Sequence, residues 1–560
     1  MVSLVLPSWC RSVPARGPAL VIAPHGGLCA LDLLAPAPST SLRGNDLHTG
    51  ELAQLLAARL DASLLANVAS DRNDLDLNRV DEVRSRAPWF LDAIAEHLER
   101  IVAEHGRALV LIVHGWQIVE PRCDVGIGAR LADAHDAAAR AARLTVSPGF
   151  VTGTLEALRA QGAVRGVRTT YGLRWPAQSP NNVMQLFRRL PDAASPHGAD
   201  AIGALAASGR VEAVQLELGA PLRYPGSWRE RFLDAAAAAF GGWMAAGADP
   251  DPPQGGGGVD GVTGRRRGEA PAPSRTSDRP APPRGAALQV FDGNAQDDGL
   301  GIVVGLGAMS PRELGARLLL LPGGQRMLLF TGHERIGPGA NDRVGGLEVR
   351  SHAGGMTVRF RGPVLDVPDA SRHFRFEAAQ VDARVAELEL ELHFAARGES
   401  GYGAVGGEAR LAGRTWRIDA HGFTEPVLAR PVAPAGSLRL TASFGGALGV
   451  TAEVAGPGHG ARVRYLTEGG VREHDVADPT VPRVIVPGRL ADAFEVRAHD
   501  GASLRCRPLG HVTLLRPGPG GRPLHVTFGA ARFALDDGTQ GGGFYEHGMP
   551  ADGGGAEGRG

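Results

Sequence analysis

One segment with almost no large apolar side chains, residues 249–285, divides the chain and limits what each side of it can fold into. It is built from glycine, proline, arginine and small polar residues. Such a composition cannot bury enough surface to offset the entropy lost on ordering. We therefore predict a flexible linker at 249–285, between an N-terminal domain at 1–248 and a C-terminal domain at 286–560.

In the N-terminal part, short apolar runs alternate with longer stretches of helical periodicity. The strand-like runs are Ala19–Ala23, Ala108–Val113 and Val211–Leu218. The helical stretches are Gly50–Leu60, Ala87–His105 and Ser147–Gln161, with Gly162 expected as a C-cap. This alternation predicts an α/β domain with a mostly parallel sheet, which gathers functional side chains at the carboxyl ends of its strands.

After residue 285 the pattern changes to that of antiparallel strands. Arg317–Phe330 and Gly407–Ala420 each contain two strand-like runs around a glycine turn, and Val385–Phe394 alternates strictly between apolar and polar residues. The sequence predicts an all-β C-terminal domain, as one large barrel or two smaller sheets.

The composition excludes several classes of function. All 59 basic residues are arginine, so no mechanism can use a lysine Schiff base, a phosphate-loop lysine or a lysine general base. A net charge of −1 gives no excess of positive charge with which to bind the phosphates of a nucleic acid. The four cysteines are widely spaced, which favours a reduced, cytoplasmic setting, and no apolar run reaches the roughly 18 residues of a membrane span.

Two histidines follow strands that a parallel sheet would bring together. His25 comes just after the first apolar run, and His114 directly ends the second. Neutral imidazole suits zinc, and a catalytic zinc site has three protein ligands. The third ligand needs to be a carboxylate, for which Asp46, Glu51 and Asp32 are the candidates.

Further polar residues complete a possible site for an acidic substrate. In the polar segment 70–79, Asn78 and Arg79 could hold a carboxylate and Arg72 could polarise a carbonyl group, although the segment could also be a charged turn that caps the next helix. Glu217 lies in the third apolar run, where a buried carboxylate needs a partner. It is either a general base or a residue on a wet strand face.

Six motifs occur in the order typical of the N-formylglutamate amidohydrolase family, and residues 18–245 resemble that family. The motifs are Pro24-His25-Gly26, Asn45-Asp46 with Glu51-Leu52-Ala53, Asp76-Leu77-Asn78-Arg79, His114-Gly115, Asp124-Val125-Gly126-Ile127-Gly128 and Gln215-Leu216-Glu217-Leu218. The family is related in fold to the zinc carboxypeptidases, a phosphorylase/hydrolase-like architecture. The carboxypeptidase His-x-x-Glu pair is absent, since Leu28 stands three positions after His25, and Trp116 follows His114-Gly115 where many relatives have a small hydroxyl residue.

The resemblance implies a role for each candidate residue. Zinc would be held by His25, Asp46 and His114, and the substrate would be anchored by Asn78 and Arg79. Arg72 would stabilise the oxyanion and Glu217 would activate water. The implied activity is zinc-dependent hydrolysis of the amide of an N-acyl amino acid or a related small acidic compound. The alternative is a non-catalytic protein that binds an apolar or lipid-linked ligand.

The C-terminal part resembles lipocalin-like proteins related to carotenoid hydratases and tocopherol cyclases. The resemblance lies in residues 345–349, 356–360 and above all 406–423. Where those proteins have an Arg-Asp-His-Ser-Trp-Gly type of motif, this chain has Thr424-Glu425-Pro426-Val427-Leu428. It implies one or more lipocalin-like barrels that bind an apolar ligand without catalysis. We expect His393, His421 and His547 there to be satisfied or exposed.

Overall fold

The computed structural model divides the chain into two compact units, one before residue 247 and one after residue 285, and the second also takes in Gln117–Glu120. The predicted linker and Asp32 lie outside the described residues. Those are 6–26, 44–130, 143–189, 201–246, 286–293, 299–310, 313–336, 342–371, 376–397, 401–424, 437–454, 461–467, 470–478, 493–498, 503–517 and 523–550.

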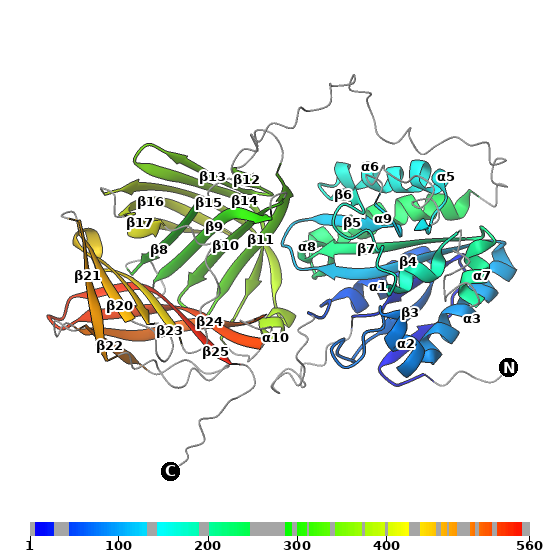
Figure 1. The fold of residues 1–560 in the computed structure, drawn as a ribbon. Coiled ribbons are helices and arrows are strands. Elements are labelled where there is room, and N and C mark those ends of the chain that lie inside the picture. Colours follow the sequence, from blue (N-terminus) through cyan, green and yellow to red (C-terminus); the bar gives the residue numbers. More distant parts are fainter. Residues whose placement is uncertain are drawn as a thin grey trace, which may run out of the picture. The chain divides into compact units, whose positions relative to one another are not determined.

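The first unit is built on a mixed, mostly parallel sheet in the order β1-β3-β2-β4-β7-β5-β6 (Figure 1). Its strands are β1 (Cys10–Val13), β2 (Ala19–Ala23), β3 (Ser63–Asn67), β4 (Ala108–Trp116), β5 (Arg122–Gly126), β6 (Arg168–Tyr171) and β7 (Val211–Gly219). β2 pairs in parallel with β3 and β4, as do β4 with β7 and β5 with β6. The predicted α/β class with a mostly parallel sheet is confirmed.

Helices cover both faces of this sheet. They are α1 (Thr49–Leu60), α2 (Val80–Arg86), α3 (Pro88–His105), α5 (Pro148–Phe150), the π-helical η2 (Val151–Leu155), α6 (Glu156–Val164), the 3₁₀ turn η3 (Val183–Phe187), α7 (Ala201–Ala207), α8 (Ala220–Arg223) and α9 (Ser227–Ala245). One apolar core joins α1, α6 and α9 to the sheet, and a second joins α2, α3 and α7 to the opposite face.

The expected helix end at Gly162 is wrong, because the helix continues to Val164. Gly162 is buried inside α6, and a Cβ atom there would lie 2.9 Å from the carbonyl oxygen of Val167. The glycine therefore permits a close backbone approach. None of the described helices has both the length and the apolar composition that crossing a membrane requires.

The second unit is all-β, as predicted, and contains two rolled sheets. The first consists of β8 (Ala286–Asp292), β9 (Leu300–Ser310), β10 (Glu313–Pro322), β11 (Met327–Arg335), β12 (Arg343–Val344), β13 (Leu347–His352), β14 (Gly355–Val367), β15 (Arg384–Ala396), β16 (Tyr402–Leu411) and β17 (Arg414–Thr424), with helix α10 (Phe376–Val381) after β14. This sheet curls far enough for β11 also to pair with β14. Both predicted hairpins are present, as β10–β11 and β16–β17.

The second rolled sheet is a closed eight-stranded barrel, seen in yellow to red in Figure 1. Its strands are β18 (Leu438–Ser443), β19 (Gly449–Val454), β20 (Ala461–Thr467), β21 (Gly470–Asp478), β22 (Phe494–Ala498), β23 (Ser503–Pro517), β24 (Pro523–Leu535) and β25 (Gln540–Pro550), with the 3₁₀ turn η5 (Gly445–Ala447) after β18. Pairing of β18 with β25 closes the ring. Its apolar interior includes Leu440, Phe533 and Tyr545.

Candidate metal centre

The candidate centre forms where β2 and β4 end beside each other in the first unit. His25 follows β2, and His114 lies near the end of β4. The chain after His25 passes tightly against the start of α1, because a Cβ atom on Gly26 would lie only 2.5 Å from the backbone nitrogen of Gly50. Asp46, just before α1, donates its backbone N–H to the carbonyl oxygen of His25 at 3.2 Å. The sheet edge and the helix start thus bring all three residues together.

Both histidine rings face one oxygen of the Asp46 carboxylate. The Nδ1 atoms of His25 and His114 lie 3.2 and 3.0 Å from Asp46 Oδ2. The ring centroids are 4.8 Å apart, and one candidate ligand atom from each of the three residues lies within 4.8 Å of the other two. All three side chains are buried, with exposures of 1–3%. Of the two candidate carboxylates in the described residues, Asp46 and Glu51, Asp46 is therefore the one that joins the two histidines.

Asp76 holds the far side of the His25 ring. Its Oδ1 lies 2.7 Å from His25 Nε2 and also accepts the backbone N–H of Asn78 at 3.0 Å. A carboxylate that accepts the Nε2 proton leaves Nδ1 as the free lone pair, which is the arrangement typical of metal-binding histidines. Sequence reasoning assigned no role to Asp76. The signal available was its place at the head of the Asp76-Leu77-Asn78-Arg79 motif.

Arg72 connects the two carboxylates. Its guanidinium donates to the carbonyl oxygen of Gly44 at 3.0 Å and to Asp76 Oδ2 at 3.3 Å, and lies 3.7 Å from Asp46 Oδ1. Arg72 therefore lies beside the two histidines and their carboxylates, and its predicted role toward a substrate carbonyl stays a prediction. Its positive charge also helps to keep the Asp76 carboxylate ionised beside His25.

The donor set fits a divalent cation. Burial favours the neutral form of His25, but hydrogen bonds to Asp46 and Asp76 outweigh the effect of burial and raise the pKa of His25. For His114 the effect of burial is the larger one, and it lowers the pKa of that ring. Burial favours a neutral Asp46, but hydrogen bonds to His114 and His25 hold its pKa well below the usual range. Two imidazole nitrogens that converge on one carboxylate oxygen need protons or a cation between them. One carboxylate and two imidazoles are ligands that suit zinc.

His114 also has a polar atom that nothing in the described structure satisfies. Its Nε2 is buried and has no hydrogen-bond partner among the described residues. A buried imidazole nitrogen without a partner is costly, and such atoms commonly mark a site that a further group completes.

Glu217 lies on the neighbouring strand, on the same face of the sheet. β4 and β7 pair His114 with Glu217, and the carboxylate is buried, so the wet-face interpretation is wrong. Burial raises the pKa of Glu217 to about 8, and the negative charge of Asp46 adds to the shift. Gln215 Nε2 donates to Glu217 Oε1 at 2.7 Å, and Asn182 Nδ2 donates to Gln215 Oε1 at 3.2 Å. This chain of amides fixes the orientation of the carboxylate.

Asp124 flanks Glu217 from β5 but has a structural role. β5 and β7 pair the two residues, and Asp124 accepts hydrogen bonds from Thr170 Oγ1 and from the backbone N–H groups of Leu173, Arg174 and Trp175. Four donors saturate this carboxylate, so it fastens the loop after β6.

The predicted substrate-binding residues have different settings. Asn78 Oδ1 is buried and accepts no hydrogen bond within the described structure. Arg79 precedes α2, where its guanidinium pairs with Asp81 at 2.7 Å and lies 3.2 Å from Glu82. This ion-paired turn at the helix start is the alternative that we weighed from the sequence. Glu51, the other carboxylate considered as a ligand, is 61% exposed and lies 3.4 Å from Arg229.

A buried arginine braces the centre from behind. Arg223 is fully buried in α8, and its guanidinium donates to the carbonyl oxygens of Leu47 and Trp116 at 2.5 and 3.4 Å. It therefore ties the Asp46 segment to the end of β4. A Cβ atom on Gly115 would lie 2.9 Å from Arg223 Cζ and 3.0 Å from Asp46 Cβ, which explains why a glycine follows His114.

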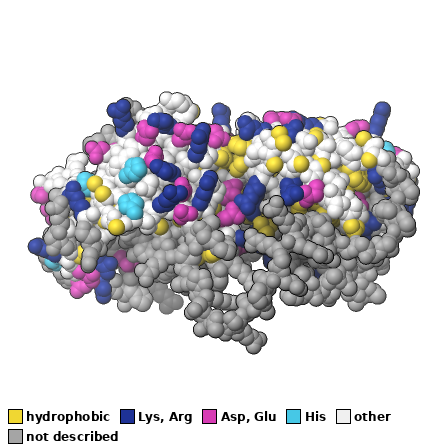
Figure 2. All heavy atoms as spheres, turned by 90° about the horizontal axis from the view of Figure 1, so that it is seen from above, with side chains coloured by type: hydrophobic (Ala, Val, Ile, Leu, Met, Phe, Trp, Pro, Cys, Tyr) yellow, Lys and Arg dark blue, Asp and Glu magenta, His cyan; other side chains and the backbone are white. Residues whose placement is uncertain are grey.

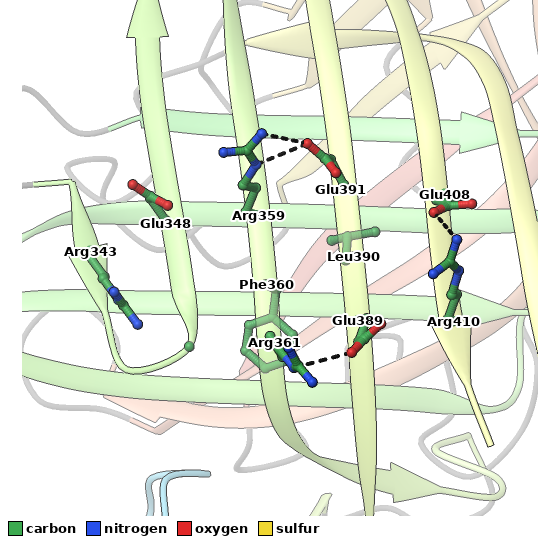
Figure 3. Close-up of a pocket in the computed structure, with 11 residues that line it drawn as sticks. Arg343, Glu348, Arg359, Phe360, Arg361, Glu389, Leu390, Glu391, Glu408 and Arg410 are labelled. Atoms are coloured by element: carbon green, nitrogen blue, oxygen red, sulfur yellow. Dashed lines mark hydrogen bonds and ion pairs between the residues drawn. The ribbon is translucent and has the colours of Figure 1, made fainter. Parts of the chain in front are cut away.

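In the second unit, a hollow lies on the outer face of β13–β16. Arginines and acidic side chains alternate across it, with Arg359 paired to Glu391 at 2.8 Å and Arg361 to Glu389 at 3.2 Å (Figure 3). Figure 2 shows basic and acidic side chains intermingled over the face of the molecule that it presents. Exposed cross-strand pairs of this kind add little stability and leave no concentrated charge for a ligand. We regard the hollow as a solvated face of the sheet.

No family model and no curated protein matches the chain. Among solved structures, the chain is similar to N-formylglutamate amidohydrolase from Ralstonia eutropha JMP134, with 14% identity, a TM-score of 0.31 and coverage of 43% of this chain and 99% of that one. It is also similar to kievitone hydratase from Nectria haematococca, with 9% identity, a TM-score of 0.31 and coverage of 48% and 88%. A gene product of Agrobacterium tumefaciens has 17% identity, a TM-score of 0.24 and coverage of 41% and 89%. These likenesses are too low to assign an activity, which has to be argued from the site.

Proposed function

We propose that the first unit is a zinc-dependent amidohydrolase that cleaves the amide of an N-acyl amino acid or a related small acidic compound. The observation that carries the proposal is the convergence of His25 Nδ1 and His114 Nδ1 on Asp46, with the buried Glu217 paired to His114 on the next strand. A structural ion pair would not require a second carboxyl group of raised pKa beside it.

His25, Asp46 and His114 would hold the metal, which when bound supplies Lewis-acid polarisation of the amide carbonyl group. Asp76 keeps the proton of His25 on Nε2, so that Nδ1 stays available. Arg72 bridges the carboxylates and offers positive charge for the oxygen that becomes negative as the amide is attacked.

Glu217 acts as the general base and then as the general acid. It takes a proton from the attacking water and returns it to the departing amine. Burial raises the pKa of Glu217 toward the neutral range, as a group that takes and returns a proton requires, and Gln215 keeps one oxygen fixed while the other remains available. Asn78 and Arg79 would bind the substrate carboxylate. To do so, Arg79 would have to break its ion pair with Asp81 and form one with the substrate.

The test combines metal analysis with a substrate screen. Purified protein is depleted with a chelator and reloaded with zinc, and the amine released from N-formyl and N-acetyl derivatives of glutamate, aspartate and leucine is measured. We expect about one equivalent of zinc and hydrolysis that favours the acidic substrates. Protein that binds no stoichiometric zinc and cleaves none of these amides would overturn the proposal. A cytoplasmic location stays a prediction from the cysteine pattern.

A further inference from the structure

Three polar side chains lie buried inside the closed barrel of β18–β25, which we call the second barrel. In the sequence they are distant from every residue of the metal centre. His511 is on β23 and Tyr545 and His547 are on β25, with exposures of 1%, 1% and 2%. The intervening strand β24 pairs Gly529 with both His511 and Tyr545, and it pairs Thr527 with His547. The three side chains therefore share one face over two adjacent rows of the barrel wall, in the strands shown in orange and red in Figure 1.

That face is the interior one, and a β-bulge places His511 on it. Tyr545 and Phe533 belong to the apolar core of the barrel, and Phe533 pairs with Cys506 of that core. The register then shifts by one residue between Pro508 and Gly510. Side chains alternate between the two faces of a strand, so if the pairing of Pro508 with Ala531 continued without a bulge, His511 would lie opposite Phe528 and point outward. Bulges often re-aim a side chain beside a functional site.

The position of Tyr545 is also built into the backbone. A Cβ atom on Gly529 would lie 2.5 Å from Tyr545 Cε1, so the tyrosine ring occupies the space above this glycine. Any larger residue at position 529 would displace the ring. A bulge and a glycine thus bring one histidine and the tyrosine onto the same patch of wall.

The polar atoms of this patch lack partners in the part of the chain that the structure describes. Both ring nitrogens of His511, Nδ1 of His547 and the hydroxyl oxygen of Tyr545 are buried without a hydrogen bond. Buried polar groups are nearly always satisfied, so each such atom calls for a partner. The expectation that His547 is satisfied or exposed is wrong for its Nδ1 atom.

The patch is uncharged and bordered by apolar residues. Burial lowers the pKa of His511 and of His547 to about 4, so both rings are neutral at pH 7, and burial raises the pKa of the Tyr545 hydroxyl. Asp369 is the acidic group that acts on His511, and it moderates the shift. On β18, Leu440 pairs with Tyr545 and Leu438 with His547. Neutral rings and a hydroxyl can both donate and accept, whereas they offer no charge to an ion.

We propose that His511, Tyr545 and His547 form a binding site inside the second barrel for a neutral, largely apolar molecule that carries a hydroxyl or carbonyl group. The polar group of the ligand would bond to the two rings and the tyrosine, while its apolar body would lie against Leu438 and Leu440. The site is independent of the proposed amidohydrolase centre.

The test uses two matched pairs of probes with the full-length protein. 1-Naphthol is compared with 1-methylnaphthalene, and phenol with toluene, by equilibrium dialysis. We expect about one equivalent of at least one hydroxylated probe to bind, with its methyl counterpart at least about tenfold weaker, because each lost hydrogen bond leaves buried groups unpaired. Tyr545→Phe removes only the hydroxyl group, and it and His511→Leu should each weaken binding of the hydroxylated probe about tenfold.

Two control variants locate the effect. His393→Leu makes the same change as His511→Leu at an exposed position on β15, and it should bind the probes as the wild type does. The double variant His25→Ala plus His114→Ala should also bind them normally, even if the amidohydrolase proposal fails. Circular dichroism checks that Tyr545→Phe is folded. The proposal is overturned if no hydroxylated probe binds, if the methyl counterparts bind equally well, or if folded Tyr545→Phe binds as the wild type does.

Discussion

The molecule buries histidines in two regions and surrounds them in opposite ways. In the first unit, His25 and His114 face Asp46, and Asp76 holds His25 from behind. In the second barrel, His511 and His547 lie on an apolar wall, and no described carboxylate hydrogen-bonds to either ring. We propose on this ground that the first pair of histidines binds a cation and the second pair a neutral partner. The two proposed uses of a buried histidine cannot be distinguished by burial alone. They are distinguished by whether carboxylates lie next to the ring.

The largest expected effect concerns metal content. The double variant His25→Ala plus His114→Ala removes two of three ligands, so bound zinc should fall from about one equivalent to none. His511→Leu plus His547→Leu should keep the full amount. Mass spectrometric metal analysis after gel filtration measures both. Equal zinc content in the two double variants would contradict the claim that only His25 and His114 bind the metal.

The next effect is on turnover. Glu217→Gln should retain zinc and lower the hydrolysis rate by about 10²–10⁴-fold, since the amide cannot accept a proton from water. Glu212→Gln is a matched control on the same strand, because Glu212 is also buried but pairs with Arg189 at 3.1 Å. Initial rates on the best substrate of the screen measure the effect. Undiminished turnover in Glu217→Gln would remove Glu217 from the mechanism.

A smaller effect is expected behind the metal centre. Gly115→Ala places a methyl group against Arg223 and Asp46, so it should disturb the brace and weaken zinc binding by about 10–100-fold, as loss of supporting contacts typically does. Gly153→Ala in η2, which has open space around a Cβ atom, is the control and should leave zinc binding unchanged. Competition with a fluorescent zinc chelator measures the affinity.

The smallest effect concerns pH, and its sign differs between the two regions. His511 and His547 have pKa values lowered to about 4, so the unfolded barrel binds protons more readily and stability falls as the pH drops from 6.5 to 4. The His25 pKa is raised, so its contribution in the metal-free protein is present below 6.5 and is lost as the pH rises through the folded value. Protonation in only the unfolded state costs the barrel about 1.4 kcal/mol per histidine at pH 5.5.

His547→Gln isolates this pH effect. Amide hydrogen exchange is measured in peptides from β23–β25 of the variant and of the wild type, at pH 5.5 and at pH 7.5. The ratio of protection in the variant to protection in the wild type should be greater at pH 5.5 than at pH 7.5. The matching variant on the outer face is His393→Gln, which should show no such difference. Equal relative protection of His547→Gln at both pH values would contradict neutral burial of His547.

The parts predicted from sequence were those that periodicity or turn chemistry encodes. The apolar runs at Ala19–Ala23 and Val211–Leu218 became β2 and β7 because such runs suit a sheet covered on both faces. His25 and His114 were found because they end neighbouring parallel strands. The hairpin at 407–420 was found from its Ala412-Gly413 turn, where both residues have positive φ.

What escaped prediction depends on packing between distant segments. The contact of Asp76 with His25 is made by a loop whose path no periodicity records. The helix end was misplaced for a local reason, because Gly166 and not Gly162 makes it. Gly166 has a φ of +77°, and the N–H groups of Gly166 and Val167 donate to the carbonyl oxygens of Ala163 and Gly162. The inward direction of His511 depends on a bulge, and no residue pattern in the sequence marks where the alternation of the strand is interrupted.

The bulge at Pro508–Gly510 makes the polarity of the barrel lumen a matter of strand register. If the pairing of Pro508 with Ala531 continued without a bulge, Gly510 would face Gly529 and every later residue of β23 would move to the opposite face. His511 would turn to the outside and Val512 would take the inward side. Deleting Leu509 would instead remove the bulge and keep His511 opposite Gly529, on the inward face. A shift of one residue in pairing, with no change in the sequence, would thus replace a histidine by a valine on the wall of the lumen.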